Sequence, residues 1–241
     1  MRAMGQALGI RGRKALRLSQ RPRLLPSLLR HRVVPSLEHV RIPFGEAVTV
    51  LDVGASRGQF ATLMRYQRPA ARIICFEPLP AALATLSRVG AASRFEIHAT
   101  ALDERRGFAP LHVATKDDSS SLLPLTERQS SEFGGMGTAG LARVETRRLD
   151  DFELDIRRPC LLKIDVQGSE LRVLRGARAT LALVDEALIE CSFVELYEGQ
   201  PLAADIVSFM AGAGFSVVGV HNVVRGRERT QLQAGFHFRR S

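Results

Sequence analysis

The chain has 241 residues with a mean hydropathy near zero, a length that suits one α/β domain with a short extension. No apolar run approaches the roughly 20 residues that cross a bilayer, and no signal-peptide pattern opens the sequence, so we expect a cytoplasmic protein. Cys75, Cys160 and Cys191 lack C-x-x-C spacing and fall in apolar runs, which argues against a disulfide framework and a zinc site.

The excess positive charge lies entirely at the beginning of the chain. The net charge is +9, yet nine of the 34 basic residues precede the first acid, Glu38, and the other 25 are balanced by 25 acidic residues. We therefore expect a basic arm over 1–37, helical or poorly ordered, ahead of a domain over 38–241. The arm suits peripheral contact with an anionic membrane, contact with nucleic acid, an organelle transit peptide or a leader packed on the domain. The balanced domain predicts no specific nucleic-acid partner.

The first strong motif runs over 48–60. Its apolar first half predicts a strand buried on both faces, followed by a tight glycine turn and a helix over 59–66. The turn matches neither the dinucleotide pattern G-x-G-x-x-G nor a P-loop. An acid before such a turn suits a positively charged ligand without phosphates, such as S-adenosylmethionine, although tight packing alone also explains two glycines. The predicted cofactor contacts are Asp52, Gly54, Ala55, Ser56, Gly58 and Phe60.

Two further strands extend the cofactor prediction. The run over 72–76 ends in Glu77 and Pro78, and a carboxylate at this point can accept both hydroxyls of a ribose. A helix over 81–89 then precedes a third strand over 95–99. By analogy with the fold, Ala101, Leu102 and Asp103 follow at the level of an adenine, although Asp103 equally suits an exposed turn. Alternating strands and helices predict parallel pairing with right-handed crossovers.

Residues 108–149 interrupt this alternation. Strand-like runs over 111–114 and 144–148 enclose a loop rich in serine and glycine. We expect this loop to cover the substrate that binds beside the cofactor. Ser119, Ser120 and Ser121 suit hydrogen bonds to a polar substrate, and turn chemistry is the competing explanation.

The second half of the domain returns to strands and helices. A buried strand over 160–165 ends in Asp165, which a doubly wound sheet would place across from Gly54 at the point where the strand order reverses. Because successive side chains of a strand point to opposite faces, we expect Lys163 to face away from Ile164 and Val166 and to pair with a neighbouring acid. A fifth strand over 187–191 carries Glu190, a helix spans 202–213, and a sixth strand over 215–220 ends at His221. Residues 231–239 would form an antiparallel last strand.

Together these segments resemble the FkbM-type family of class I methyltransferases. The likeness rests on the motifs already described and on three others: Ser119–Leu122, Leu149–Asp151 and Leu162–Gly168 with its continuation to Ala177. The resemblance implies a doubly wound, Rossmann-like α/β sheet, mostly parallel with an antiparallel last strand. It also implies S-adenosylmethionine-dependent O-methylation of a sugar hydroxyl or a secondary metabolite. Gln167 and Gly235 depart from the family pattern, which often has glutamate and aspartate there.

Methylation of a hydroxyl needs a base to take the proton. Asp165 is the first candidate by position, His221 the second by its intrinsic pKa, and Glu190 would support either. Gln167 is a predicted substrate contact beside the serines. Asp165, Glu190 and Asp150 or Asp151 are oxygen ligands that suit magnesium, but no spacing requires a metal. The alternatives are a non-catalytic binding module of the same fold and a nicotinamide-dependent reductase.

Overall fold

The computed structural model describes residues 33–115, 119–135, 137–227 and 229–241. Most of the predicted basic arm therefore lies outside the described residues. Within the described ranges, no helix combines the length and the apolar character needed to span a membrane.

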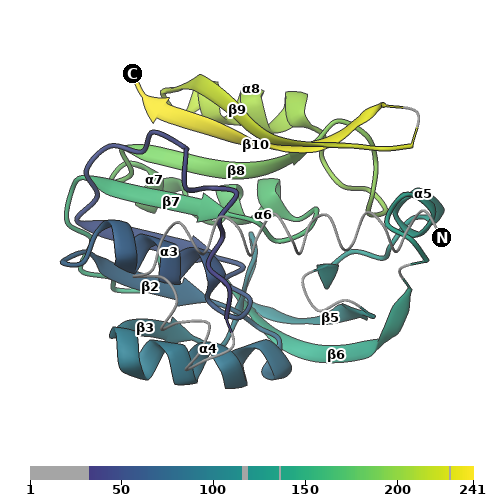
Figure 1. The fold of residues 1–241 in the computed structure, drawn as a ribbon, viewed down its shortest axis with the longest axis horizontal. Coiled ribbons are helices and arrows are strands. Elements are labelled where there is room, and N and C mark those ends of the chain that lie inside the picture. The colour runs from purple at the N-terminus through teal and green to yellow at the C-terminus, as the bar shows by residue number, and fades with distance from the viewer. Residues whose placement is uncertain (1–32, 116–118, 136, 228) are drawn as a thin grey trace.

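A seven-stranded sheet forms the centre of the domain (Figure 1). Every neighbouring pair from β3 to β8 is parallel, and β10 is antiparallel to both β8 and β9. This confirms the predicted doubly wound α/β fold with an antiparallel last strand. In spatial order the strands are β3 (Phe95–His98), β2 (Arg72–Phe76), β1 (Thr49–Val53), β7 (Cys160–Ile164), β8 (Glu186–Ser192), β10 (Gln231–Arg240) and β9 (Phe215–Arg225).

Helices cover both faces of the sheet, so every residue of the central strands β1 and β7 is buried. Val50 of β1 packs on the face covered by α3 (Gln59–Gln67), whereas its neighbour Leu51 belongs to the core on the opposite face. Successive side chains of one strand thus enter two different cores. The remaining helices are α4 (Pro80–Ser93), α5 (Glu127–Glu132), α6 (Glu170–Arg175), α7 (Arg178–Leu181) and α8 (Ala203–Gly212), with the short 3₁₀ helix η3 (Leu149–Asp151).

Residues 33–46 pack on the same face as α3 (Figure 1). Leu37 is buried against Tyr66 of α3, and Phe44 makes an edge contact with Phe60. The predicted boundary at residue 37 therefore falls inside a segment that packs on the domain. This matters for function because the segment also reaches the cavity described below.

The segment after β3 builds a second, smaller sheet. It has the order β4 (Ala101–Leu102), β6 (Thr138–Arg147) and β5 (Gly107–Ala114), and β5 and β6 form an antiparallel pair. The predicted strands at the two ends of this insert are correct in position but too short.

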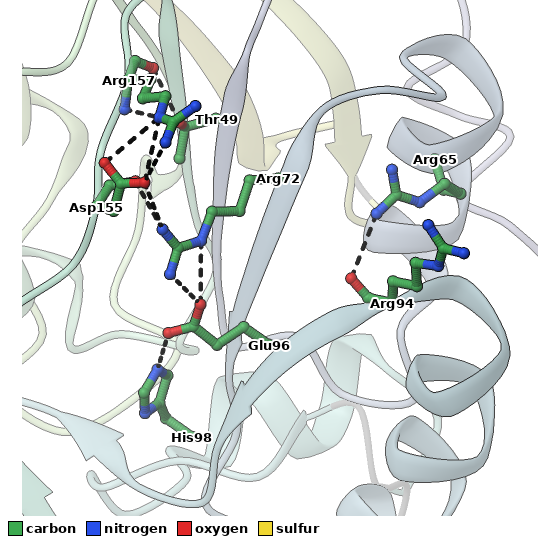
Figure 2. Close-up of polar contacts among 8 residues, drawn as sticks. All are labelled: Thr49, Arg65, Arg72, Arg94, Glu96, His98, Asp155 and Arg157. Atoms are coloured by element: carbon green, nitrogen blue, oxygen red, sulfur yellow. Dashed lines mark hydrogen bonds and ion pairs between the residues drawn. The ribbon is translucent and has the colours of Figure 1, made fainter.

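An ion-pair network joins the first half of the sheet to the loop before β7 (Figure 2). Arg72 bridges Glu96 of β3, with Nη2 and Oε2 2.6 Å apart, and Asp155, with Nη1 and Oδ2 3.3 Å apart. His98 continues the row through Glu96 at 3.0 Å. Thr49 exchanges hydrogen bonds with the backbone of Arg157 in the same region. The network ties this loop to β1, β2 and β3.

Candidate active site

A cavity of about 490 Å³ opens at the carboxyl ends of β1, β2, β7 and β8. The strand order reverses between β1 and β7, and open α/β sheets bind ligands at this point. The wall combines residues from the strand ends, the insert and the segment before β1. It includes Ser36, His39, Val53, Gly54, Ala55, Ser56, Gln59, Phe60, Phe76, Glu77, Pro78, Thr100, Ala101, Leu102, Ser119, Ser120, Gln129, Phe133, Lys163, Asp165, Gln167, Glu190 and Gln233.

The turn after β1 lies in close contact with the backbone at the end of β7. Gly54 has a φ of 73°, and a Cβ there would overlap the carbonyl oxygen of Asp165. The amide of Gly54 donates to Phe76 O at 3.0 Å, so the turn also contacts β2. Gly58, with a φ of 87°, precedes α3 and does not line the cavity. Only glycine fits at position 54, and its bare backbone forms part of the cavity wall.

Glu77 lies on the same wall with only 7% of its surface exposed. Its Oε2 accepts from the amide of Ser56 at 2.8 Å, and its Oε1 accepts from the amide of Leu79 at 2.7 Å. Burial raises the pKa of Glu77, and these two amide donors oppose the rise. Each carboxylate oxygen keeps a second lone pair for a ligand.

Asp52 is fully buried and does not line the cavity. Its Oδ1 lies 3.2 Å from Nζ of Lys163, and its Oδ2 accepts from the amide of Ala61 at 3.2 Å. Burial alone would lower the pKa of Lys163, but the carboxylates of Asp52 and Asp165 outweigh burial and raise it to about 12. Lys163 therefore points toward acids, as strand alternation predicted. The structure does not support Asp52 as a direct cofactor contact.

Asp165, Gln167 and Glu190 meet on the wall formed by β7 and β8. Nε2 of Gln167 donates to Asp165 Oδ1 at 2.7 Å and to Glu190 Oε2 at 2.8 Å. Oδ2 of Asp165 lies 3.7 Å from Nζ of Lys163, and 34% of the Asp165 side chain is exposed. Asp165 therefore presents an accessible carboxylate, and the amide of Gln167 joins it to Glu190 on the same wall.

The insert contributes to this wall through two of the three predicted serines. Ser119 and Ser120 line the cavity. Ser121 does not, because its hydroxyl donates to Gln167 O at 2.6 Å and accepts from the amide of Leu123. The hydroxyl of Tyr197 lies between the insert and Gln167, 3.1 Å from Ser119 O and 2.6 Å from Gln167 Oε1.

Comparison with known proteins identifies this arrangement. The family model described as "Methyltransferase FkbM domain" matches residues 52–217, which run from the end of β1 to the start of β9 and include Gly54, Glu77 and Asp165 of the cavity wall. The chain belongs to the FkbM methyltransferase family. The predicted family and the predicted class, an S-adenosylmethionine-dependent methyltransferase, are thereby confirmed.

Individual FkbM relatives agree with the family model. The chain is 34% identical over 188 residues to the 2-O-methyltransferase NoeI of Sinorhizobium fredii, covering 74% of this chain and 75% of NoeI. It is 31% identical over 195 residues to the 31-O-demethyl-FK506 methyltransferase FkbM of Streptomyces tacrolimicus, covering 70% and 73%. A crystal structure of a methyltransferase FkbM from Methylobacillus flagellatus KT matches with a TM-score of 0.54 at 18% identity. That match covers 86% of this chain and 49% of the other, so this chain spans about half its length.

Two residues predicted to act at the FkbM-family site lie elsewhere. Asp103 does not line the cavity, because its carboxylate forms a two-point ion pair with Arg172 of α6, with Arg172 Nε and Asp103 Oδ1 2.8 Å apart. His221 of β9 is also absent from the wall, and its ring lies 6.0 Å from that of His237. Burial and His237 lower the pKa of His221. The structure supports neither Asp103 as an adenine contact nor His221 as the second base, whereas Ala101 and Leu102 do line the cavity.

The FkbM-family cavity also contains a histidine that the motifs did not indicate. His39 lies in the segment before β1, makes an edge contact with Phe60 and lines the cavity. Its Nδ1 is buried and has no hydrogen-bond partner among the described residues. Burial lowers the pKa of His39. Gln59 and Gln233 also line the wall; Gln59 lies within the motif over 48–60 but was not predicted as a contact, and no motif marked Gln233.

The acids considered as magnesium ligands do not gather at one point. Asp150 accepts hydrogen bonds from the amides of Ala179 and Thr180, and Asp151 pairs with Arg106 at 2.6 Å. Among the described residues, no group of three or more His, Cys, Asp or Glu side chains is arranged to hold a metal ion.

Glu170 makes the stability of the fold depend on pH. It is buried, and its Oε1 accepts from the amides of Val166 and Gly168 at 3.1 Å. Burial raises its pKa to about 7 against the pull of those amides. The folded protein therefore keeps a proton that the unfolded chain loses near pH 4.5. The stability from this group is complete below about pH 4.5 and is lost as the pH rises to about 7.

We expect Glu170→Gln to remove this part of the pH dependence, which amounts to roughly 3 kcal/mol of unfolding free energy across that interval. The glutamine oxygen can still accept the backbone hydrogen bonds. The measurement is urea unfolding of both proteins from pH 4.5 to 8, with the exposed Glu46→Gln as a control. Parallel curves for the parent and Glu170→Gln would contradict this assignment.

Proposed function

We propose that this protein transfers the methyl group of S-adenosylmethionine to a hydroxyl oxygen of an acceptor bound in the cavity, with Asp165 as the general base. The observation that supports it is the convergence of three features on one cavity: the backbone turn at Gly54, the carboxylate of Glu77 and the accessible carboxylate of Asp165. The turn and Glu77 suit the cofactor, and Asp165 is available to the acceptor.

The cavity residues at the ends of β1 and β2 and on β4 fit S-adenosylmethionine by their chemistry. Glu77 has free lone pairs for the two ribose hydroxyls, and Ala101 with Leu102 offers an apolar surface for the adenine. Backbone groups of Gly54 to Ser56 would hold the methionine part. When bound, the cofactor supplies a methyl group on a positively charged sulfur. The carboxylates of Glu77 and Asp165 in the wall complement that charge.

Asp165 performs the acid–base part of the reaction. It would accept a hydrogen bond from the acceptor hydroxyl and take its proton as that oxygen bonds to the methyl carbon and the bond from this carbon to the cofactor sulfur breaks, which leaves S-adenosylhomocysteine. Proton transfer of this kind contributes about a hundredfold to ten-thousandfold to the rate. Holding the two reactants in line can contribute about 7 to 11 kcal/mol more, so positioning by the cavity is the larger effect.

The acceptor is a small molecule or a glycan with a free hydroxyl. Two relatives are named for O-methylation, NoeI at a 2-O position and the Streptomyces enzyme at a 31-O position. The rest of the cavity lining offers hydroxyl and amide groups with one aromatic ring, a combination that suits a sugar or a hydroxylated secondary metabolite. These groups belong to Gln59, Ser119, Ser120, Phe133 and Gln233.

The first test is calorimetry of the full chain with S-adenosylhomocysteine, followed by transfer of a tritiated methyl group to fractionated sugar, glycan and polyketide pools. We expect one binding site per chain and label in a hydroxylated product. No binding would contradict the proposal, and binding without transfer to any pool would favour a non-catalytic module. NADPH is the control ligand, because its binding would favour the reductase.

A further inference from the structure

Two carboxyl groups of the cavity wall, those of Asp165 and Glu190, bind the same amide nitrogen. Nε2 of Gln167 lies 2.7 Å from Asp165 Oδ1 and 2.8 Å from Glu190 Oε2, so the two carboxyl groups are adjacent. Two ionised carboxylates repel each other at this separation, so such a pair retains one proton.

The amide of Gln167 is fixed in the orientation that supports the pair. Its Oε1 lies 2.6 Å from the hydroxyl of Tyr197, and its backbone oxygen accepts from the hydroxyl of Ser121 at 2.6 Å. A flipped amide would set its oxygen against the oxygens of Asp165 and Glu190. Gln167 also has a φ of 59°, a left-handed conformation that is uncommon for a residue other than glycine. Its position is therefore set by its contacts and not by backbone preference.

The surroundings of Glu190 favour the proton on its side of the pair. Burial raises the pKa of Glu190 well above its ordinary value, and the nearby Asp165 and Glu170 raise it further. Lys163 opposes this rise, and Gln233 donates from Nε2 to Glu190 Oε1 at 2.8 Å. A third of the Asp165 side chain is exposed at the cavity, so an acceptor can reach this carboxylate.

We propose that Asp165 and Glu190 act as one carboxyl pair that shares a single proton, and that Gln167 is the positioning residue that holds the pair together at the cavity. This inference rests on the proposed function, in which Asp165 is the base. During a turnover Asp165 gains the hydroxyl proton, so both carboxyl groups are then neutral. The pair returns to its starting state when one proton passes to solvent.

The test is an infrared pH titration of the full chain, because a protonated carboxyl group has its own absorption band and no acceptor is needed. We expect such a band at pH 7 that disappears in Glu190→Gln. In Gln167→Glu, a substitution of equal size, two N–H donors are replaced by a third acid. The titration midpoint of the pair should then rise by at least one pH unit, a tenfold change in proton affinity.

Two controls isolate this effect. Gln67→Glu adds an acid on α3 away from the cavity and should leave the midpoint unchanged, and Glu170→Gln identifies the band of the other protonated glutamate. If Gln167→Glu does not fold, Gln167→Met removes the same donors and should also raise the midpoint. Absence of the Glu190 band, or an unchanged midpoint with S-adenosylhomocysteine still bound, would overturn this inference alone. Failure of the parent to bind S-adenosylhomocysteine would instead contradict the proposed function.

Discussion

Asp165→Asn is expected to lower kcat by about a hundredfold to ten-thousandfold, the usual contribution of a general base. Affinity for S-adenosylhomocysteine should change by less than about threefold, because the proposed cofactor contacts lie on the turn after β1 and on Glu77. The asparagine has the same size and can still accept the hydrogen bond from Gln167. It cannot take a proton from the acceptor.

The measurement combines turnover with any acceptor found in the tritium screen and calorimetry on the same preparation. Asp155→Asn is the matched control, since Asp155 lies in the exposed ion-pair network of Figure 2 and not at the cavity. We expect it to retain the parent rate. Retained activity in Asp165→Asn would remove Asp165 as the base. Equal loss in both variants would attribute the effect to the fold.

The main sheet could be predicted because its signals are local. The parallel strands β1, β2 and β7 are short, mostly apolar runs followed directly by glycine or an acid, and these ends meet at one edge of the sheet. The same logic placed Asp165 against Gly54 and turned Lys163 toward an acid. The insert was harder, because β5 and β6 are largely exposed and lack a continuous apolar run. Their weak pattern explains why the predicted strands were too short.

The errors at the site have a different cause, since they depend on partners far away in the sequence. Asp103 turns from the cavity because Arg172, 69 positions later, binds its carboxylate. Gln167 bridges Asp165 and a glutamate that comes 23 positions later. His39 reaches the wall from a segment without a recognisable motif. Motif spacing reports backbone turns well, but it does not report which side chain pairs with which.

The turn after β1 carries the second large prediction. We expect Gly54→Ala to destabilise the fold by roughly 2 to 5 kcal/mol and to abolish S-adenosylhomocysteine binding. About 1 to 2 kcal/mol comes from the left-handed conformation at a φ of 73°. Overpacking adds about 1 to 3 kcal/mol, since the new methyl group would overlap the backbone oxygen of Asp165. Backbone cannot rotate away as a side chain can, so β1 and β7 must separate at the cavity.

Gly199→Ala distinguishes these two contributions. Gly199 has a φ of 70°, almost the same conformation as Gly54, but a Cβ there would meet no atom within 4 Å. It should therefore show only the conformational cost of about 1 to 2 kcal/mol and bind S-adenosylhomocysteine normally. Urea unfolding and calorimetry of both variants provide the comparison. Equal destabilisation in the two would mean that the β1 turn and β7 are not in close contact, and the cavity between them would have a different shape.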